Sequence, residues 1–125
     1  MIERVTPEHI STLQPGQIFV FGSNQYGHHA GGAARYALDH FGAEWGNGEG
    51  LQGQSYAIPT MEGLASTKQA VQRFITFARQ HQELTFLVTP IGCGIAGYTA
   101  DEIAPFFADF LIPAKFLKNC LKIWY

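Results

Sequence analysis

Three short apolar runs, separated by segments with helical periodicity, limit the possible folds of this chain most strongly. The runs cover residues 18–21, 55–58 and 85–88, and their continuous apolar character is typical of strands buried on both faces. Strands of this kind pair in parallel and need helical crossovers between them. The order of elements therefore predicts an α/β fold, with a mostly parallel central sheet and helices on both faces.

Three segments with a 3.6-residue apolar period are the expected helices. The apolar face of the first, residues 31–41, is formed by Ala34, Ala37, Leu38 and Phe41. The other two begin at sequence patterns for capping boxes, Ser66 with Gln69 and Thr99 with Glu102, in which each side chain bonds a backbone N–H of the other residue. The apolar stripe of the third is formed by Ile103, Phe106, Phe107, Phe110 and Leu111.

The remaining stretches predict one long loop and one final strand. Residues 41–54 are glycine-rich and have no period, so we expect a loop that could cover a ligand. Apolar and polar residues alternate over residues 119–125, as in a strand. With 125 residues and no internal repeat, the chain is expected to form one domain over residues 1–125.

Charge and cysteine content exclude several classes of function. The net charge is −2 and charged residues make up only 14%, against a usual ~25%, so we expect no nucleic-acid binding. No apolar stretch approaches the ~18 residues of a membrane span, and residues 1–16 do not resemble a signal peptide. Cys93 and Cys120 lack metal-ligand spacing. We expect no metal or cofactor and a reduced, cytoplasmic setting, with the oligomeric state left open.

Two glycine-rich loops each follow a predicted strand and precede a predicted helix. They are residues 22–32, GSNQYGHHAGG, and residues 90–98, PIGCGIAGY. Ligands of open α/β sheets bind at the carboxyl ends of strands, where unpaired N–H groups at helix starts attract anions and glycine permits close approach. A diphosphate is the simplest ligand that uses both loops. Alternatively, each loop only turns a corner.

The same two loops carry a resemblance to a known family. Asn24 precedes the cluster Gly31-Gly32-Ala33-Ala34, and the run 88–98 contains Gly-x-Gly-x-x-Gly followed by Tyr98. Over roughly residues 18–112 the chain resembles the macrodomain family of ADP-ribose-binding modules, in particular a compact branch associated with phages and bacteria. The resemblance implies a three-layer α/β/α sandwich that binds ADP-ribose or a related nucleotide diphosphate, with hydrolysis of an ADP-ribosyl bond as a further activity.

The resemblance also implies a role for individual residues. Asn24 would contact the ribose nearest the scissile bond, Gly31 and Gly32 would pass beneath it, and Tyr98 would stack on the distal ribose or cover the pocket. Backbone N–H groups of residues 92–97 would wrap the diphosphate. The implied ligand-binding set is Gly22, Ser23, Asn24, Gly31, Gly32, Gly92, Cys93, Gly94, Ile95, Ala96, Gly97 and Tyr98.

The chain departs from the family at its acidic positions. The Asp that reads adenine in typical members is not found near the first strand, and Ala34 stands where hydrolytic members often have Asp. His28 and His29 are therefore the candidate proton-transfer groups, with Asn24 orienting a water, although both histidines also suit a solvated loop. Cys93 suits either a nucleophile that uses His28 as base or a small packing residue.

Two alternative functions remain open at this point. One is a phosphatase that acts on a small nucleotide such as ADP-ribose 1″-phosphate, with His28 or His29 transferring the proton. The other is a non-catalytic interaction module, because 14% aromatic residues and a low charge content leave apolar surface for a partner.

Overall fold

The structure, a computed structural model, describes residues 10–94, 96–107 and 121–123. Its five-stranded sheet has the order β2-β3-β1-β4-β5. The strands are β1 (Gln17–Ser23), β2 (Gly50–Gln52), β3 (Ser55–Pro59), β4 (Thr85–Val88) and β5 (Leu121–Ile123). All neighbouring pairs are parallel except β2 with β3, which confirms the predicted α/β class with a mostly parallel sheet.

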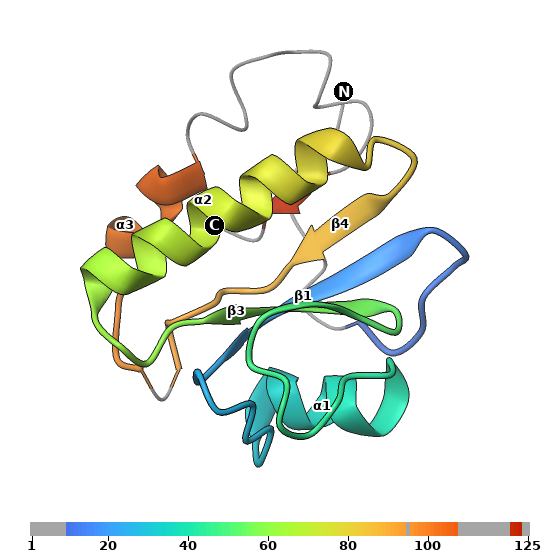
Figure 1. Cartoon of the computed structure of the whole chain (residues 1–125), viewed down its shortest axis with the longest axis horizontal. Helices are drawn as coiled ribbons and strands as arrows, with labels where there is room; N and C mark the ends of the chain where they lie inside the picture. The colour runs from blue at the N-terminus through green and yellow to red at the C-terminus, as the bar shows by residue number, and fades with distance from the viewer. Residues whose placement is uncertain (1–9, 95, 108–120, 124–125) are drawn as a thin grey trace.

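The helices pack on both faces of this sheet. They are α1 (Gly32–His40), α2 (Leu64–Gln80) and the short α3 (Ala100–Ile103), which a 3₁₀ turn, η1 (Ala104–Phe107), extends. Figure 1 shows α1 on one side of the strands and α2 on the other. Among the described residues, no helix is long and apolar enough to span a bilayer.

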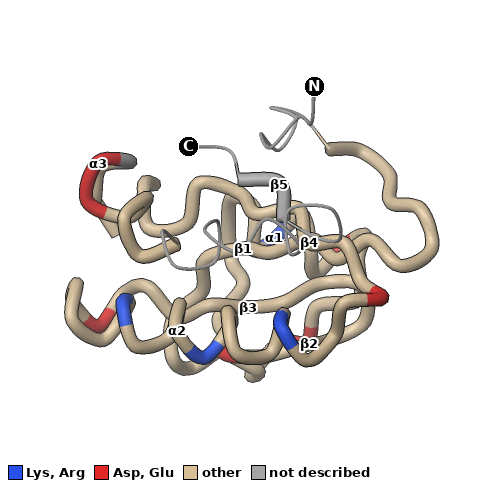
Figure 2. Tube along the Cα trace, turned by 90° about the horizontal axis from the view of Figure 1, so that it is seen from above, with Lys and Arg blue, Asp and Glu red and all other residues tan. Residues whose placement is uncertain are grey.

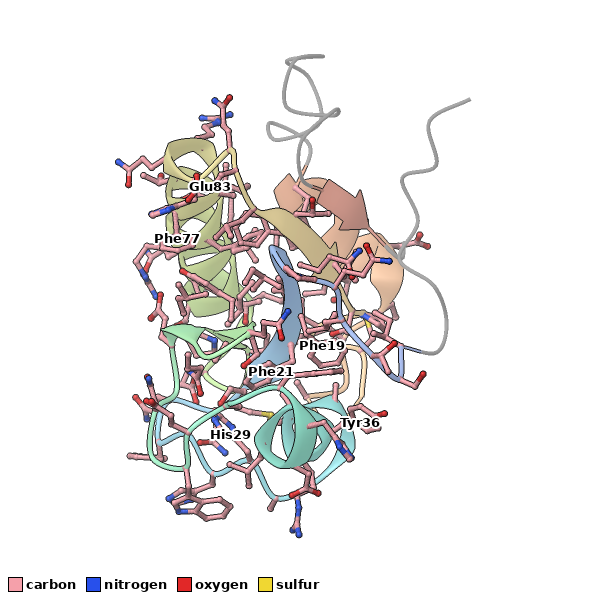
Figure 3. The ribbon with its side chains drawn as sticks, turned by 90° about the vertical axis from the view of Figure 1, so that its right-hand side faces the viewer. Phe19, Phe21, His29, Tyr36, Phe77 and Glu83 are labelled. Atoms are coloured by element: carbon pink, nitrogen blue, oxygen red, sulfur yellow. The ribbon has the colours of Figure 1, made fainter. Side chains whose placement is uncertain are left out.

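Strand β1 is buried on both faces because its side chains alternate between two cores. Ile18 and Val20 join the core beneath α2, whereas Phe19 and Phe21 join the core beneath α1. Figure 3 labels Phe19 and Phe21. At the centre of the larger core, the ring of Phe74 lies edge-on to that of Phe86, with centroids 5.2 Å apart. This alternation explains why residues 18–21 are all apolar.

Parallel pairing brings the carboxyl ends of three strands to one edge of the sheet, which we call the carboxyl edge. Ser23 at the end of β1 is level with Pro59 at the end of β3, and Val20 pairs with Val88 at the end of β4. The loops that follow these strands therefore meet. A Cβ placed on Gly22 would lie 3.4 Å from the backbone nitrogen of Gly92, so the two glycine-rich loops start in contact.

One of the two predicted capping boxes is confirmed. At α3, Thr99 N–H donates to Glu102 Oε1 (2.9 Å) and Glu102 N–H donates to Thr99 Oγ1 (3.2 Å). The box predicted at Ser66 and Gln69 is wrong, because α2 begins earlier, at Leu64, with Gly63 as its N-cap and no side-chain cap.

Two further predictions need correction. Residues 41–54 are not entirely loop, since they contain β2, which pairs antiparallel with β3. The third helix leaves the α conformation after Ile103, and Pro105 has no N–H with which to continue the α-helical ladder. Phe110 and Leu111 lie outside the described residues. Strand β5 confirms the predicted final strand over residues 121–123, and the rest of that prediction also lies outside.

Candidate functional site

The Asn24 side chain organises the first glycine-rich loop. Its Oδ1 atom accepts hydrogen bonds from the N–H groups of Tyr26 (3.0 Å) and His28 (3.1 Å), and its Nδ2 atom donates to His28 O (3.4 Å). These bonds form an Asx-type turn. One hydrogen of the half-exposed Asn24 amide is left to contact a ligand, whereas its oxygen already serves the loop.

The structure places His29 in the core and not on the ligand side of the loop. Its side chain is 0% exposed, with Nδ1 3.3 Å from Ser23 Oγ and Nε2 3.1 Å from Asn47 O. Phe21 meets the imidazole edge-on at 5.1 Å, as Figure 3 illustrates. This burial favours a structural role for His29 over the predicted catalytic one, because its ring does not reach the surface. Ser23 is likewise buried and supports the loop.

The side chain of Gln52 holds the segment 41–54 together through hydrogen bonds to the backbone of that segment. Its Nε2 donates to the carbonyls of Asn47 (3.1 Å) and Gly50 (3.2 Å), and its Oε1 accepts from Glu44 N–H (2.8 Å). The side chain is only 3% exposed. Sequence reasoning missed Gln52, since a lone glutamine in a glycine-rich stretch carries no periodic signal.

Two glycines, Gly27 and Gly48, allow the first glycine-rich loop to contact the segment 41–54. The N–H of Gly46 donates to Gly27 O at 2.9 Å. A Cβ on Gly27 would overlap the backbone of Asn47, and a Cβ on Gly48 would overlap the carbonyls of Asn24 and Gln25. Gly27 and Gly48 therefore allow the two segments to pack closely against each other.

His28, unlike His29, is exposed, and it belongs to a group of aromatic rings. The imidazole stacks on Trp45 with a centroid distance of 5.3 Å and an interplanar angle of 12°. Its distance to the Tyr26 ring is 5.8 Å. Tyr26 and Trp45 are 63% and 58% exposed. We call these three residues the aromatic cluster, and His28 is the candidate proton-transfer residue that remains accessible.

The amino end of α1 is open to solvent. Gly31 is its N-cap in an extended conformation (φ −158°), with no side-chain cap and no acidic residue in the first turn. A Cβ on Gly31 or on Gly32 would meet no other atom of the described residues within 4 Å. The amino end of α3, in contrast, is closed by Glu102. The first-turn N–H groups of α1 are therefore available to an anion.

The second glycine-rich loop is folded by its own backbone. N–H groups of Ile91, Cys93, Gly97 and Tyr98 donate to the carbonyls of Thr89, Pro90, Gly94 and Gly92, respectively. The predicted wrapping of a diphosphate therefore has fewer N–H groups than expected. Gly94 and Gly97 still face open space, since a Cβ on either meets nothing within 4 Å. Ala96 is half-buried, and Ile95 lies outside the described residues.

The side chains of Tyr98 and Cys93 face the protein. A Cβ on Gly92 would lie 3.0 Å from the Tyr98 ring, which also packs against the core beneath α2. The Cys93 thiol is 3.5 Å from Ile91 O. Burial raises the pKa of the Cys93 thiol, and the Glu102 carboxylate raises it further. A raised pKa disfavours the thiolate, so the geometry favours Cys93 as a packing residue.

A carboxylate missed by the sequence reasoning lies at the carboxyl edge. Glu62, in the loop between β3 and α2, accepts a hydrogen bond from Gln25 N–H at 3.3 Å. The two residues are 37 positions apart, and only the parallel pairing of β1 with β3 brings them together. In the part of the chain that the structure describes, no three His, Cys, Asp or Glu residues are grouped to hold a metal ion.

Comparison with models of known protein families, with curated proteins and with solved structures gives no significant match. The case for a function therefore rests on the residues and geometry of the carboxyl edge.

Proposed function

We propose that the chain binds ADP-ribose or a related nucleotide diphosphate at the carboxyl edge, in a three-layer α/β/α arrangement of the macrodomain type. The observation that carries this proposal is the open amino end of α1. Its glycine cap leaves N–H groups and a partial positive charge facing solvent. The second glycine-rich loop starts beside the first one, because Gly22 lies against Gly92.

The two loops would contribute to phosphate binding in a different way from the one that the sequence implies. Because the second loop uses several of its own N–H groups, α1 would supply most of the hydrogen bonds to one phosphate. The second loop would contribute close backbone approach at Gly94 and Gly97, where a Cβ would fill open space. The Asn24 amide would donate to the ribose.

Hydrolysis of an ADP-ribosyl bond is the further activity that we propose. His28 is the accessible histidine of the first loop, and Glu62 brings a carboxylate to the same loop. Together they supply an acid and a base where the carboxylates of hydrolytic macrodomains are missing. The same groups would suit phosphate release from ADP-ribose 1″-phosphate, and product analysis with both substrates separates these reactions.

Glycine substitutions test the site without disturbing the backbone. Gly31→Val suits the extended conformation of Gly31, and Gly94→Val projects into open space, so both variants should fold. Each should weaken ADP-ribose binding at least tenfold in calorimetry. Gln72→Val on the exposed face of α2 is the matched control and should bind like the wild type. Unchanged affinity in both glycine variants would refute the site.

A further inference from the structure

We propose that the aromatic cluster of Tyr26, His28 and Trp45 binds a planar cation, the guanidinium group of an arginine side chain on a partner protein. The proposal shares His28 and Glu62 with the proposed nucleotide site, but it does not rest on nucleotide binding. It starts from two large aromatic side chains that remain 63% and 58% exposed, Tyr26 and Trp45, although burial of such rings is strongly favourable.

The rings stand on loops that are fixed from several directions. Asn24 bonds the N–H groups of Tyr26 and His28. Gly46 N–H bonds Gly27 O, and Gly48 has no room for a Cβ against the carbonyls of Asn24 and Gln25. Below them, His29 and Gln52 tie both segments to the sheet. Exposed rings on a rigid support lose little conformational entropy when they bind a partner.

The charged residues of the loops around the aromatic cluster favour a positively charged partner. Glu44 directly precedes Trp45, and Glu62 bonds the N–H of Gln25, which directly precedes Tyr26. Residues 24–31, 41–54 and 60–63 contain no Lys or Arg. Figure 2 shows basic positions along α2, where Arg73 is paired with Glu49 through contacts of 2.6 and 3.0 Å. The loops that carry and adjoin the aromatic cluster are therefore acidic and contain no Lys or Arg.

This combination favours a guanidinium over other planar groups. A guanidinium is flat and always charged, stacks on Trp and Tyr faces, and donates paired hydrogen bonds to a carboxylate. A nucleobase would use the ring faces but would gain nothing from the negative charge of the neighbouring carboxylates. An ammonium group would gain the charge but less of the stacking.

Nuclear magnetic resonance of the Trp45 indole N–H tests the proposal on the whole chain without nucleotide. The signal is assigned by its loss in Trp45→Phe. The probe is Nα-acetyl-L-arginine amide, and the matched neutral compound is Nα-acetyl-L-citrulline amide, at constant ionic strength. We expect saturable shifts of the Trp45 signal with the arginine probe and at least tenfold weaker binding of the citrulline compound.

Variants assign the effect to the cluster. Trp45→Leu should abolish the shifts that arginine causes in the Gly27 amide signal, and the double change Glu44→Gln with Glu62→Gln should weaken binding at least threefold. Leu51→Ala, which removes an exposed apolar side chain from β2, should leave binding unchanged. The proposal would be overturned if the citrulline compound bound as well as the arginine compound, if adenosine bound more tightly than the arginine compound, or if the Trp45 signal did not move. This holds whatever the result with ADP-ribose.

Discussion

The Nε2 atom of His29 lies 3.3 Å from Oε1 of Gln52, and both side chains are almost completely buried. His29 belongs to the first loop and Gln52 to the edge strand β2. The same imidazole nitrogen also lies 3.1 Å from Asn47 O. One buried polar group thus joins the loop after β1, the segment 41–54 and the sheet edge, so these parts are expected to unfold together.

His29→Ala should therefore destabilise the fold, because it removes the buried contacts of the imidazole with Ser23 Oγ, Asn47 O and Gln52 Oε1 and leaves a cavity in their place. We expect a loss of about 2–3 kcal/mol in the free energy of unfolding, measured by urea denaturation. The matched change His28→Ala removes an exposed ring and should cost about 1 kcal/mol or less. Equal losses in the two variants would contradict the structural role of His29.

Gly48→Ala tests the contact between the two loops. The new Cβ would overlap the carbonyls of Asn24 and Gln25, and such overpacking costs about 1–3 kcal/mol of stability. Gly31→Ala is the control, because its backbone is extended and its surroundings are open. Thermal unfolding should show a lower Tm for Gly48→Ala alone. A Gly48→Ala variant as stable as Gly31→Ala would mean that the loops are not in contact.

The two sequence patterns for capping boxes should behave differently when mutated. Thr99→Ala removes the side chain that caps α3 and should lower the free energy of unfolding by about 1 kcal/mol. Ser66→Ala lies inside α2, whose N-cap is Gly63, and should change stability by less than about 0.5 kcal/mol. Urea denaturation of both variants checks this contrast, and a larger loss in Ser66→Ala would place the start of α2 at Ser66.

Stability should fall at alkaline pH because of Tyr56. Burial, followed by the Glu49 carboxylate, raises the pKa of Tyr56 to about 12 in the folded chain, while Arg73 lowers it slightly. The fold therefore favours the neutral phenol. Its contribution to stability is complete below pH ~10, the unfolded value, and is lost as the pH rises through the folded value, by roughly 3 kcal/mol in total.

The variant Tyr56→Phe isolates this effect from the other groups that titrate at high pH. Urea denaturation between about pH 9 and pH 11.5 should show a steeper loss of stability in the wild type than in Tyr56→Phe. Parallel curves for the two proteins would show that Tyr56 titrates as it does in the unfolded chain.

The main elements of the fold could be predicted from the sequence because periodicity reports burial directly. The continuous apolar run 18–21 predicts a strand with cores on both faces, and Val20 and Phe21 are indeed 0% exposed on opposite sides of β1. Strand β2 could not be predicted in this way. Its three residues include Gly50 and Gln52, and they are held by pairing with β3 and not by an apolar pattern.

Side-chain direction explains most of what the sequence could not predict about the site. His28 and His29 are neighbours, yet one is exposed beside Trp45 and the other is buried against Phe21. Loop sequence has no period from which to assign these directions. Glu62 was missed for another reason, since its approach to Gln25 depends on strand pairing between distant segments.

Calorimetric titration of the wild-type chain with ADP-ribose tests the central claim most directly. AMP, ADP and ribose 5-phosphate serve as partial ligands. If α1 and the second glycine-rich loop hold a diphosphate beside a ribose, ADP-ribose should bind with micromolar affinity. ADP should bind at least tenfold more weakly, and AMP and ribose 5-phosphate more weakly still. The absence of heat with ADP-ribose, or equal affinity for ADP-ribose and AMP, would contradict a site built for the diphosphate and the distal ribose.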